Sequence, residues 1–241
     1  MSEPKRAIIV GAGHRAITYA SYAQRHPEQL QIVGVADPTP LRREQTAARF
    51  DLKPEQCHPS AEALAELPQQ AEFIINGTMD HQHVQTALPL LRRGYDMLLE
   101  KPFATSEDDL WELVSTVRQH QSKVAICHVL RHAPFYAAIR QQVADGAIGR
   151  VLNIQAVEHV SYHHMAVGFI RGKWSRIDYC QSPMLMAKSC HDLDLIAWMK
   201  SGVAPTRVAS FGSNFQFRRE NAPDGAGSRC LVDCPIESEC S

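Results

Sequence analysis

Short apolar runs alternate with longer stretches of helical spacing through the first half of the chain. Consecutive Val, Ile, Leu and Ala residues in these runs are typical of strands that are buried on both faces of a parallel sheet. The predicted strands are 5–10, 31–36, 72–76, 95–99 and 123–128. The helices predicted between them are 14–25, 40–50, 60–67, 81–93 and 107–120. This alternation predicts an α/β fold with a doubly wound parallel sheet of the Rossmann type.

The alternation stops near residue 130. Beyond it, helices are predicted over 133–145 and 189–201, and two longer strands over 150–160 and 207–217. A loop rich in His, Gly and aromatic residues follows the first of these strands. The pattern therefore predicts a second α/β region with an open sheet.

We divide the chain on this basis into a Rossmann domain, 1–128, and a substrate and oligomerisation domain, 129–241. A sheet of two strands is only marginally stable in water and leaves its edges unpaired. We therefore expect the second domain to be incomplete in this chain, and the chain to be inactive, prone to aggregation, or stabilised by a partner that covers the sheet.

A glycine-rich turn joins the first predicted strand to the first predicted helix. It reads Gly11-Ala12-Gly13-His14-Arg15-Ala16, which is the pattern G-x-G-x-x-A. The first Gly permits a tight turn, the second lets the backbone approach a pyrophosphate, and the small Ala allows the helix to pack closely on the strand. The turn predicts a dinucleotide site whose phosphates face the start of the helix.

Asp37 strengthens this prediction because it ends the second predicted strand. A carboxylate at that place accepts hydrogen bonds from an adenosine ribose and repels a 2′-phosphate, which favours NAD over NADP. Arg42 and Arg43 follow closely, and an arginine there can pair with the extra phosphate. NADP therefore stays open as an alternative.

Composition and charge exclude several classes of partner. The 241 residues have a formal net charge of −1, whereas nucleic acid or an anionic membrane would favour a basic excess. We see neither a secretory leader nor an apolar stretch long enough to span a membrane. We therefore expect a cytoplasmic protein with a small-molecule substrate.

Seven cysteines occur, and an odd number without a leader peptide favours reduced thiols over a disulfide framework. Cys230, Cys234 and Cys240 cluster near the end of the chain. Structural zinc generally needs four ligands with closer spacing, so we expect no metal and leave a zinc site open as the weaker alternative.

Several motifs, in order, resemble the glucose–fructose oxidoreductase and inositol dehydrogenase family, also called Gfo/Idh/MocA. The most specific is Glu100-Lys101-Pro102 at the end of the fourth strand. The glycine-rich turn, Asp37, Arg131-x-x-Pro134-Phe135 and His191-Asp192-x-Asp194-Leu195 accompany it. The resemblance implies hydride transfer between a nicotinamide and a hydroxyl-bearing carbon of a sugar or cyclitol, and an oligomer formed through the second domain's sheet.

The resemblance also implies roles for individual residues. Lys101 would touch both substrate and nicotinamide ribose, and its place at the carboxyl end of a parallel strand independently favours a ligand contact. His191 would lie near the reacting hydroxyl, where its titration range suits acid–base work. The residues expected at the cofactor are Gly11, Gly13, His14, Arg15, Asp37, Thr78, His83, Glu100 and Lys101.

The chain departs from the family at one catalytic position. Many members carry an Asp four residues before the histidine, whereas this chain has Ala187 followed by Lys188. We therefore place Lys188 beside Lys101 and His191 as a supporting catalytic residue. A lysine serves as a base only where burial or a nearby cation lowers its pKa.

The loop after the first long strand holds the candidate substrate contacts. Arg171 would bind a carboxylate or sugar oxygens, Trp174 would stack on a sugar ring, and His163 would lie nearby. An NAD(P)-dependent oxidoreductase is therefore the leading hypothesis. The alternatives are a sensor that binds dinucleotide without turnover and an enzyme that uses bound NAD transiently during glycoside cleavage.

Overall fold

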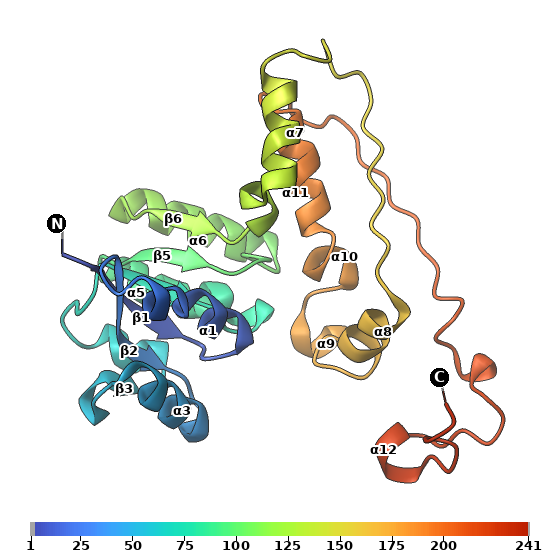
Figure 1. Ribbon diagram of the computed structural model, residues 1–241, viewed down its shortest axis with the longest axis horizontal. Helices are drawn as coiled ribbons and strands as arrows, with labels where there is room; N and C mark the ends of the chain where they lie inside the picture. The colour runs from blue at the N-terminus through green and yellow to red at the C-terminus, as the bar shows by residue number, and fades with distance from the viewer. Residues whose placement is uncertain (1–2, 241) are drawn as a thin grey trace. The chain divides into compact units, whose positions relative to one another are not determined.

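A parallel sheet forms the core of the N-terminal part of the chain in a computed structural model that describes residues 3–240 (Figure 1). Its strand order is β3-β2-β1-β4-β5-β6. The strands are β1 (Lys5–Val10), β2 (Leu30–Ala36), β3 (Cys57–His58), β4 (Phe73–Asn76), β5 (Asp96–Leu99) and β6 (Val124–Ile126). The order reverses between β1 and β4, and ligands of such sheets bind outside the carboxyl ends of the strands at that point. The predicted α/β class and Rossmann-type sheet are thus confirmed.

Helices cover both faces of this sheet (Figure 1). Side-chain caps fix two of their starts: the Ser60 hydroxyl accepts from the Ala63 N–H, and the Ser106 hydroxyl accepts from the Asp109 N–H. The helices are α1 (His14–Ala20), α2 (Tyr22–Arg25), α3 (Pro40–Phe50), α4 (Ala61–Ala65), α5 (His83–Arg92) and α6 (Glu107–His120), with single 3₁₀ turns at η1 (Pro54–Gln56) and η2 (Asp80–Gln82).

The core shows why the first strand reads as continuously apolar. Ile8 and Val10 point into a cluster with α4, α5 and α6, whereas Ala7 and Ile9 point into a second cluster with α1. Successive strand residues face opposite sides, so a strand with helices on both sides needs apolar residues at every position. All four side chains are almost completely buried.

Short helices and long connections follow the sheet. They are η3 (Val129–His132), α7 (Pro134–Ala144), α8 (Tyr162–Met165), the π-helical turn η4 (Ala166–Ile170), α9 (Ile177–Cys180), α10 (Met184–Ala187) and α11 (Cys190–Met199). Met1–Ser201 forms one compact unit, and Gly202–Ser241, with η5 (Arg219–Asn221) and α12 (Cys230–Asp233), forms another. A functional boundary at residue 128 stays a prediction.

The two long strands predicted in the second region are wrong. Residues 151–160 and 203–215 contain no regular secondary structure, and no described residue after β6 forms a strand. Several of their apolar side chains point into solvent, with Leu152 80% and Phe211 96% exposed. Alternating apolar residues suit a strand, but a strand forms only where a neighbour takes its backbone hydrogen bonds. The expected open sheet is therefore not formed by the described residues.

No helix in the described range is long and apolar enough to cross a membrane.

The predicted helices 40–50 and 107–120 coincide with α3 and α6. The strand β3 escaped prediction because two residues are too few to show a period.

Candidate active site

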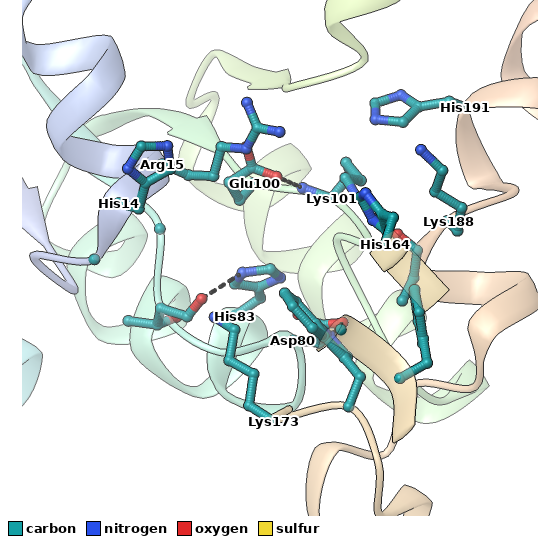
Figure 2. A pocket seen from close by; sticks show the side chains of 17 residues that line it. His14, Arg15, Asp80, His83, Glu100, Lys101, His164, Lys173, Lys188 and His191 are labelled. Atoms are coloured by element: carbon teal, nitrogen blue, oxygen red, sulfur yellow. Dashed lines mark hydrogen bonds between the residues drawn. The ribbon is translucent and has the colours of Figure 1, made fainter. Parts of the chain in front are cut away.

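A cavity of about 390 Å³ lies beyond the carboxyl ends of β1, β4 and β5, in the size range of small-molecule sites (Figure 2). The sheet and its following turns form one side, and α8 to α11 with their connections form the other. All of its lining residues belong to the compact unit Met1–Ser201. They are Gly13, His14, Arg15, Gly77, Thr78, Asp80, His83, Glu100, Lys101, His164, Gly168, Phe169, Lys173, Trp174, Ala187, Lys188 and His191.

The glycine-rich turn packs tightly on one side and leaves space on the other. Gly11 has φ +76°, and a Cβ atom there would lie 2.7 Å from the Thr78 backbone nitrogen. A Cβ on Gly13 would meet only the Gly77 carbonyl oxygen, at 3.7 Å, so its surroundings are open toward the cavity. Ala16 is buried against Gly77, where a Gly77 Cβ would come within 2.8 Å of the Ala16 Cβ. Gly11 thus shapes the turn, and Gly13 leaves its backbone accessible.

The Glu100 carboxylate organises the turn after β5. Its Oε1 accepts a hydrogen bond from the Tyr19 hydroxyl of α1, and its Oε2 accepts from the Lys101 backbone N–H at 2.8 Å. Burial and the Glu100 charge raise the pKa of Tyr19, and burial with the same charge raises that of the Cys127 thiol to about 12. Tyr19 and Cys127 therefore stay neutral beside a carboxylate that holds the turn.

His83 holds the same turn from α5. Its Nδ1 lies 2.7 Å from the Pro102 carbonyl oxygen, and its Nε2 lies 3.2 Å from the Thr78 carbonyl oxygen. The Lys101–Pro102 peptide bond is cis. Burial lowers the pKa of His83, opposed by these carbonyls and by nearby carboxylates. This buried ring therefore connects the ends of β4 and β5 beneath the cavity.

Lys101 reaches across the cavity. Its Nζ donates to the Ala187 carbonyl oxygen at 2.6 Å, at the end of α10. Figure 2 shows Lys101 between Glu100 on one side and Lys188 and His191 on the other. Ala187 thus contacts the lysine through its backbone, because the Ala187 side chain has no polar atom.

Two further side chains, those of Lys188 and His191, line the cavity from the part of the chain that follows α10. The Lys188 Nζ lies 3.2 Å from Glu158 Oε1, in the extended segment before α8. Burial and then the charges of Lys101, His128 and Lys188 lower the pKa of His191 to about 4. Its buried Nδ1 has no hydrogen-bond partner among the described residues. His191 is therefore neutral at neutral pH.

A second contact joins the two sides of the cavity at Asp80. This carboxylate is 6% exposed, and its Oδ2 accepts from the Trp174 indole N–H at 2.9 Å. The Lys173 ammonium lies 4.4 Å from the Trp174 ring centre. Desolvation lowers the pKa of Lys173, and the Asp80 charge opposes that shift.

Asp37 lies at the end of β2 and does not line this cavity. Its Oδ2 accepts from the Ala12 N–H and its Oδ1 from the Thr39 N–H, both at 2.8 Å. Arg42 places a guanidinium nitrogen 3.8 Å from the same carboxylate, and Arg43 donates to the Asp37 carbonyl oxygen at 2.6 Å. A carboxylate and an exposed arginine thus share the place where the sequence predicts the adenosine ribose.

Most of the predicted site residues line one cavity. The three predicted catalytic residues Lys101, Lys188 and His191 do so. Among the predicted substrate contacts, Trp174 lines the cavity, whereas Arg171 and His163 do not, and His164 lies there instead. Neighbouring residues of a helical turn point in different directions, so a sequence pattern cannot choose between two adjacent histidines.

Sequence reasoning missed Asp80, Phe169 and Lys173. Asp80 follows the end of β4, where ligands of parallel sheets bind, and that position was a usable signal. Phe169 lies in the π-helical turn η4 and Lys173 in the connection after it, and no local pattern predicts the path of either.

The structure offers no metal site in the part of the chain that it describes. No group of three or more His, Cys, Asp or Glu side chains there could hold an ion. The Cys230 side chain lies outside the described part, so the alternative zinc cluster of Cys230, Cys234 and Cys240 stays untested.

Comparison with known proteins assigns the region that forms the sheet to a family. A family model described as an oxidoreductase family with an NAD-binding Rossmann fold, GFO_IDH_MocA, matches residues 5–128. The Bacillus subtilis protein YteT, whose name assigns it to the oxidoreductases, is 26% identical over 98% of this chain and 56% of its own length. Inositol 2-dehydrogenase 2 of Saccharopolyspora erythraea is 23% identical over 68% of this chain and 44% of its own.

Solved structures share the architecture. The WlbA dehydrogenase of Chromobacterium violaceum, in complex with NADH and UDP-GlcNAcA, superposes with a TM-score of 0.69 over 83% of this chain and 56% of its own. The identity is 19%, so this likeness shows the fold alone. The chain spans about half the length of the relatives that it matches.

Proposed function

Because the chain belongs to the oxidoreductase family with an NAD-binding Rossmann fold, we propose that it is a dehydrogenase that oxidises a hydroxyl-bearing carbon of a sugar-like or cyclitol-like substrate. The observation that carries the proposal is the single cavity lined by Gly13, Lys101 and His191. It combines an accessible turn backbone, an ammonium and a neutral imidazole. Among relatives, an inositol dehydrogenase supports the substrate class.

The residues around the turn fit a dinucleotide. Gly13 leaves open space, His14 and Arg15 line the same cavity, and Asp37 with Arg42 lies at the end of β2. We assign the phosphates to the turn and the adenosine ribose to Asp37. When bound, NAD supplies a nicotinamide that accepts hydride from the substrate carbon.

Lys101 and His191 would divide the proton chemistry. The Lys101 ammonium would donate a hydrogen bond to the substrate oxygen and stabilise negative charge there as the carbon–oxygen bond order rises. The neutral His191 imidazole would take the hydroxyl proton, because it lines the same cavity as Lys101 and its pKa is low. Ala187 would position Lys101 through its carbonyl oxygen.

The identity of the substrate, the oligomeric state and the location of the protein are further parts of this proposal. The oligomer contact was predicted through an open sheet after β6, and the described residues 3–240 form no strand there. Oligomerisation through this region stays a prediction. A cytoplasmic location stays a prediction also.

Equilibrium binding of NADH tests the proposal most directly. Gly13→Val should abolish NADH binding measured by calorimetry, because the side chain would fill the open space beside the turn. Turnover of polyols and sugars by the parent protein should be followed as NADH formation at 340 nm.

Gly212→Val is the matched control, since a Cβ at Gly212 meets no atom within 4 Å. It should bind NADH as the parent does. Equal NADH affinity in Gly13→Val would remove the turn from the cofactor site, and a parent that binds no NADH would refute the proposed function.

A sensor that binds dinucleotide without turnover is the second candidate. The observation that favours it is the uncharged Ala187 at the position where many family members carry an acid. This candidate would be supported if the chain binds NADH but turns over none of the small molecules that bind to the chain with its dinucleotide. Turnover of one such substrate would refute it.

A further inference from the structure

The lining of the cavity carries more positive than negative groups. Arg15 and three lysines, Lys101, Lys173 and Lys188, face two carboxylates, Asp80 and Glu100. The histidines add no negative charge. A concave site lined mainly by one sign concentrates ligands of the other sign.

Both carboxylates are already engaged by the protein. Glu100 accepts from Tyr19 and from the Lys101 backbone, and Asp80 accepts from Trp174. Each is 6% exposed, so neither presents a free anionic surface to a ligand. These neutral donors occupy carboxylate oxygens and leave both negative charges in place, so the lining keeps two more positive than negative groups.

The lysine ammoniums, in contrast, retain donors. Lys101 gives one hydrogen bond to the Ala187 carbonyl oxygen, and an ammonium has three N–H groups. Lys188 lies next in the chain and pairs with Glu158, whose side chain is 41% exposed and is not part of the lining. The Lys188 side chain is 28% exposed, so the pair is partly open to solvent; such pairs contribute little, and a ligand can compete for Lys188.

The phosphates of a dinucleotide do not account for these lysines. We assign the phosphates to the turn at Gly13, beside Arg15, which leaves the three lysines to the remainder of the cavity. Oxidised nicotinamide adds another positive charge to that region. A neutral polyol would leave this excess of charge uncompensated.

We propose that the substrate bears an anionic group, a carboxylate or a phosphate, which Lys188 binds while Lys101 contacts the reacting hydroxyl. The inference rests on the proposed function, because it places the acidic substrate beside a bound nicotinamide. It narrows the substrate class from sugars in general to acidic sugars or polyol acids. Lys101 contacts the Ala187 carbonyl oxygen, and Lys188 is the next residue along the chain. The proposed contact to the anionic group therefore lies beside the proposed contact to the reacting hydroxyl.

Binding of matched ligands to the NADH-loaded chain tests this inference. The probes are D-glucuronate, D-glucose 6-phosphate and D-glucose, which share one skeleton, with L-tartrate and L-threitol as a second matched series. We expect the carboxylate or the phosphate to bind at least ~10-fold more tightly than the neutral partner, the scale of a charge-assisted hydrogen bond. A higher salt concentration should weaken the binding of the acidic probes and leave the binding of the neutral probes unchanged.

Lys188→Gln should remove most of this preference and leave neutral ligands and NADH within about twofold of the parent. Lys123→Gln is the control, because Lys123 precedes β6 at the opposite end of that strand from the cavity. Equal binding of acidic and neutral probes, or a preference that survives Lys188→Gln, would overturn the inference while NADH still binds. Loss of NADH binding by the parent would instead refute the proposed function.

Discussion

The two sides of the cavity are held in different ways. On the sheet side, Glu100 and His83 fix the Lys101 turn through contacts to Tyr19, the turn backbone and the end of β4. Both side chains are buried. This side is built into the core, so its geometry follows from the fold of the sheet.

The other side depends on a few longer-range contacts. Lys101 to Ala187 and Trp174 to Asp80 connect it to the sheet side. Arg131 forms a bidentate pair with Asp194 in the middle of α11, at 2.6 and 2.7 Å. Lys188 and His191 lie on this side, and the segment before α8 makes no strand. We infer that the sheet fixes the position of Lys101, whereas the positions of the proposed proton acceptor His191 and the proposed anion contact Lys188 depend on the less constrained side.

Removal of the central ammonium should give the largest effect. Lys101→Ala should lower turnover by ~10²-fold or more, because a positioned hydrogen-bond donor to the reacting oxygen is lost. NADH affinity should change much less, since the turn backbone stays intact. The measurement is turnover under saturating substrate together with NADH calorimetry.

Lys123→Ala provides the control for loss of an exposed lysine. Normal turnover in Lys101→Ala would exclude the residue from the mechanism. A loss of NADH affinity as large as the loss in turnover would make Lys101 a cofactor contact instead.

The sheet side was predictable from the sequence because its signals are local. Each strand is an apolar run, the turn at Gly11 needs a positive φ, and Glu100-Lys101-Pro102 directly follows β5. The position of Lys101 at a strand end then follows from the topology.

The other side was predictable only in part. The helix that carries His191 was predicted, but the path of 151–160, which precedes α8, was not, because these residues form no regular secondary structure. An alternating pattern reports which face is apolar and does not report whether a partner is present. The Trp174 to Asp80 contact spans 94 positions, and no local pattern encodes it.

Loss of the indole contact should weaken the less constrained side. Trp174→Phe keeps an aromatic ring but leaves the buried Asp80 carboxylate without its donor, which costs about 1–3 kcal/mol. The midpoint of thermal unfolding should fall by roughly 2–10 °C for a domain of this size. Differential scanning fluorimetry gives the measurement.

Trp111→Phe removes the same type of contact at the surface, because the Trp111 indole donates to Glu107 within α6 at 3.2 Å. Trp111 is 59% exposed, so this variant should unfold almost as the parent does. Equal effects of the two substitutions would show that the Asp80 contact does not hold the cavity together.

The pH profile should report the charges around His191. A proton acceptor must be neutral, and its pKa of about 4 keeps it neutral far below the usual histidine range. Oxidation should therefore lose rate only as the pH falls toward about 4. Lys188→Gln removes one of the charges that lower this pKa, so the acidic limb should move to higher pH.

Circular dichroism at each pH separates titration from unfolding. An acidic limb near the ordinary histidine pKa in the parent, or a limb that Lys188→Gln does not move, would contradict the proposed role. His191→Asn should abolish the limb together with most of the activity.

Cofactor choice should respond least, because Arg42 is exposed and its ion pair is long. The Arg42 guanidinium lies 3.8 Å from the Asp37 carboxylate with 56% of its side chain exposed. Arg42→Ala should weaken NADPH binding by about two- to fivefold, the range of an exposed ion pair, and leave NADH almost unchanged. Arg25→Ala, an exposed arginine on α2, is the control. NADPH should bind less tightly than NADH in every variant, because the Asp37 carboxylate repels a 2′-phosphate. A parent that prefers NADPH, with the preference lost in Arg42→Ala, would assign cofactor choice to the arginine rather than to Asp37.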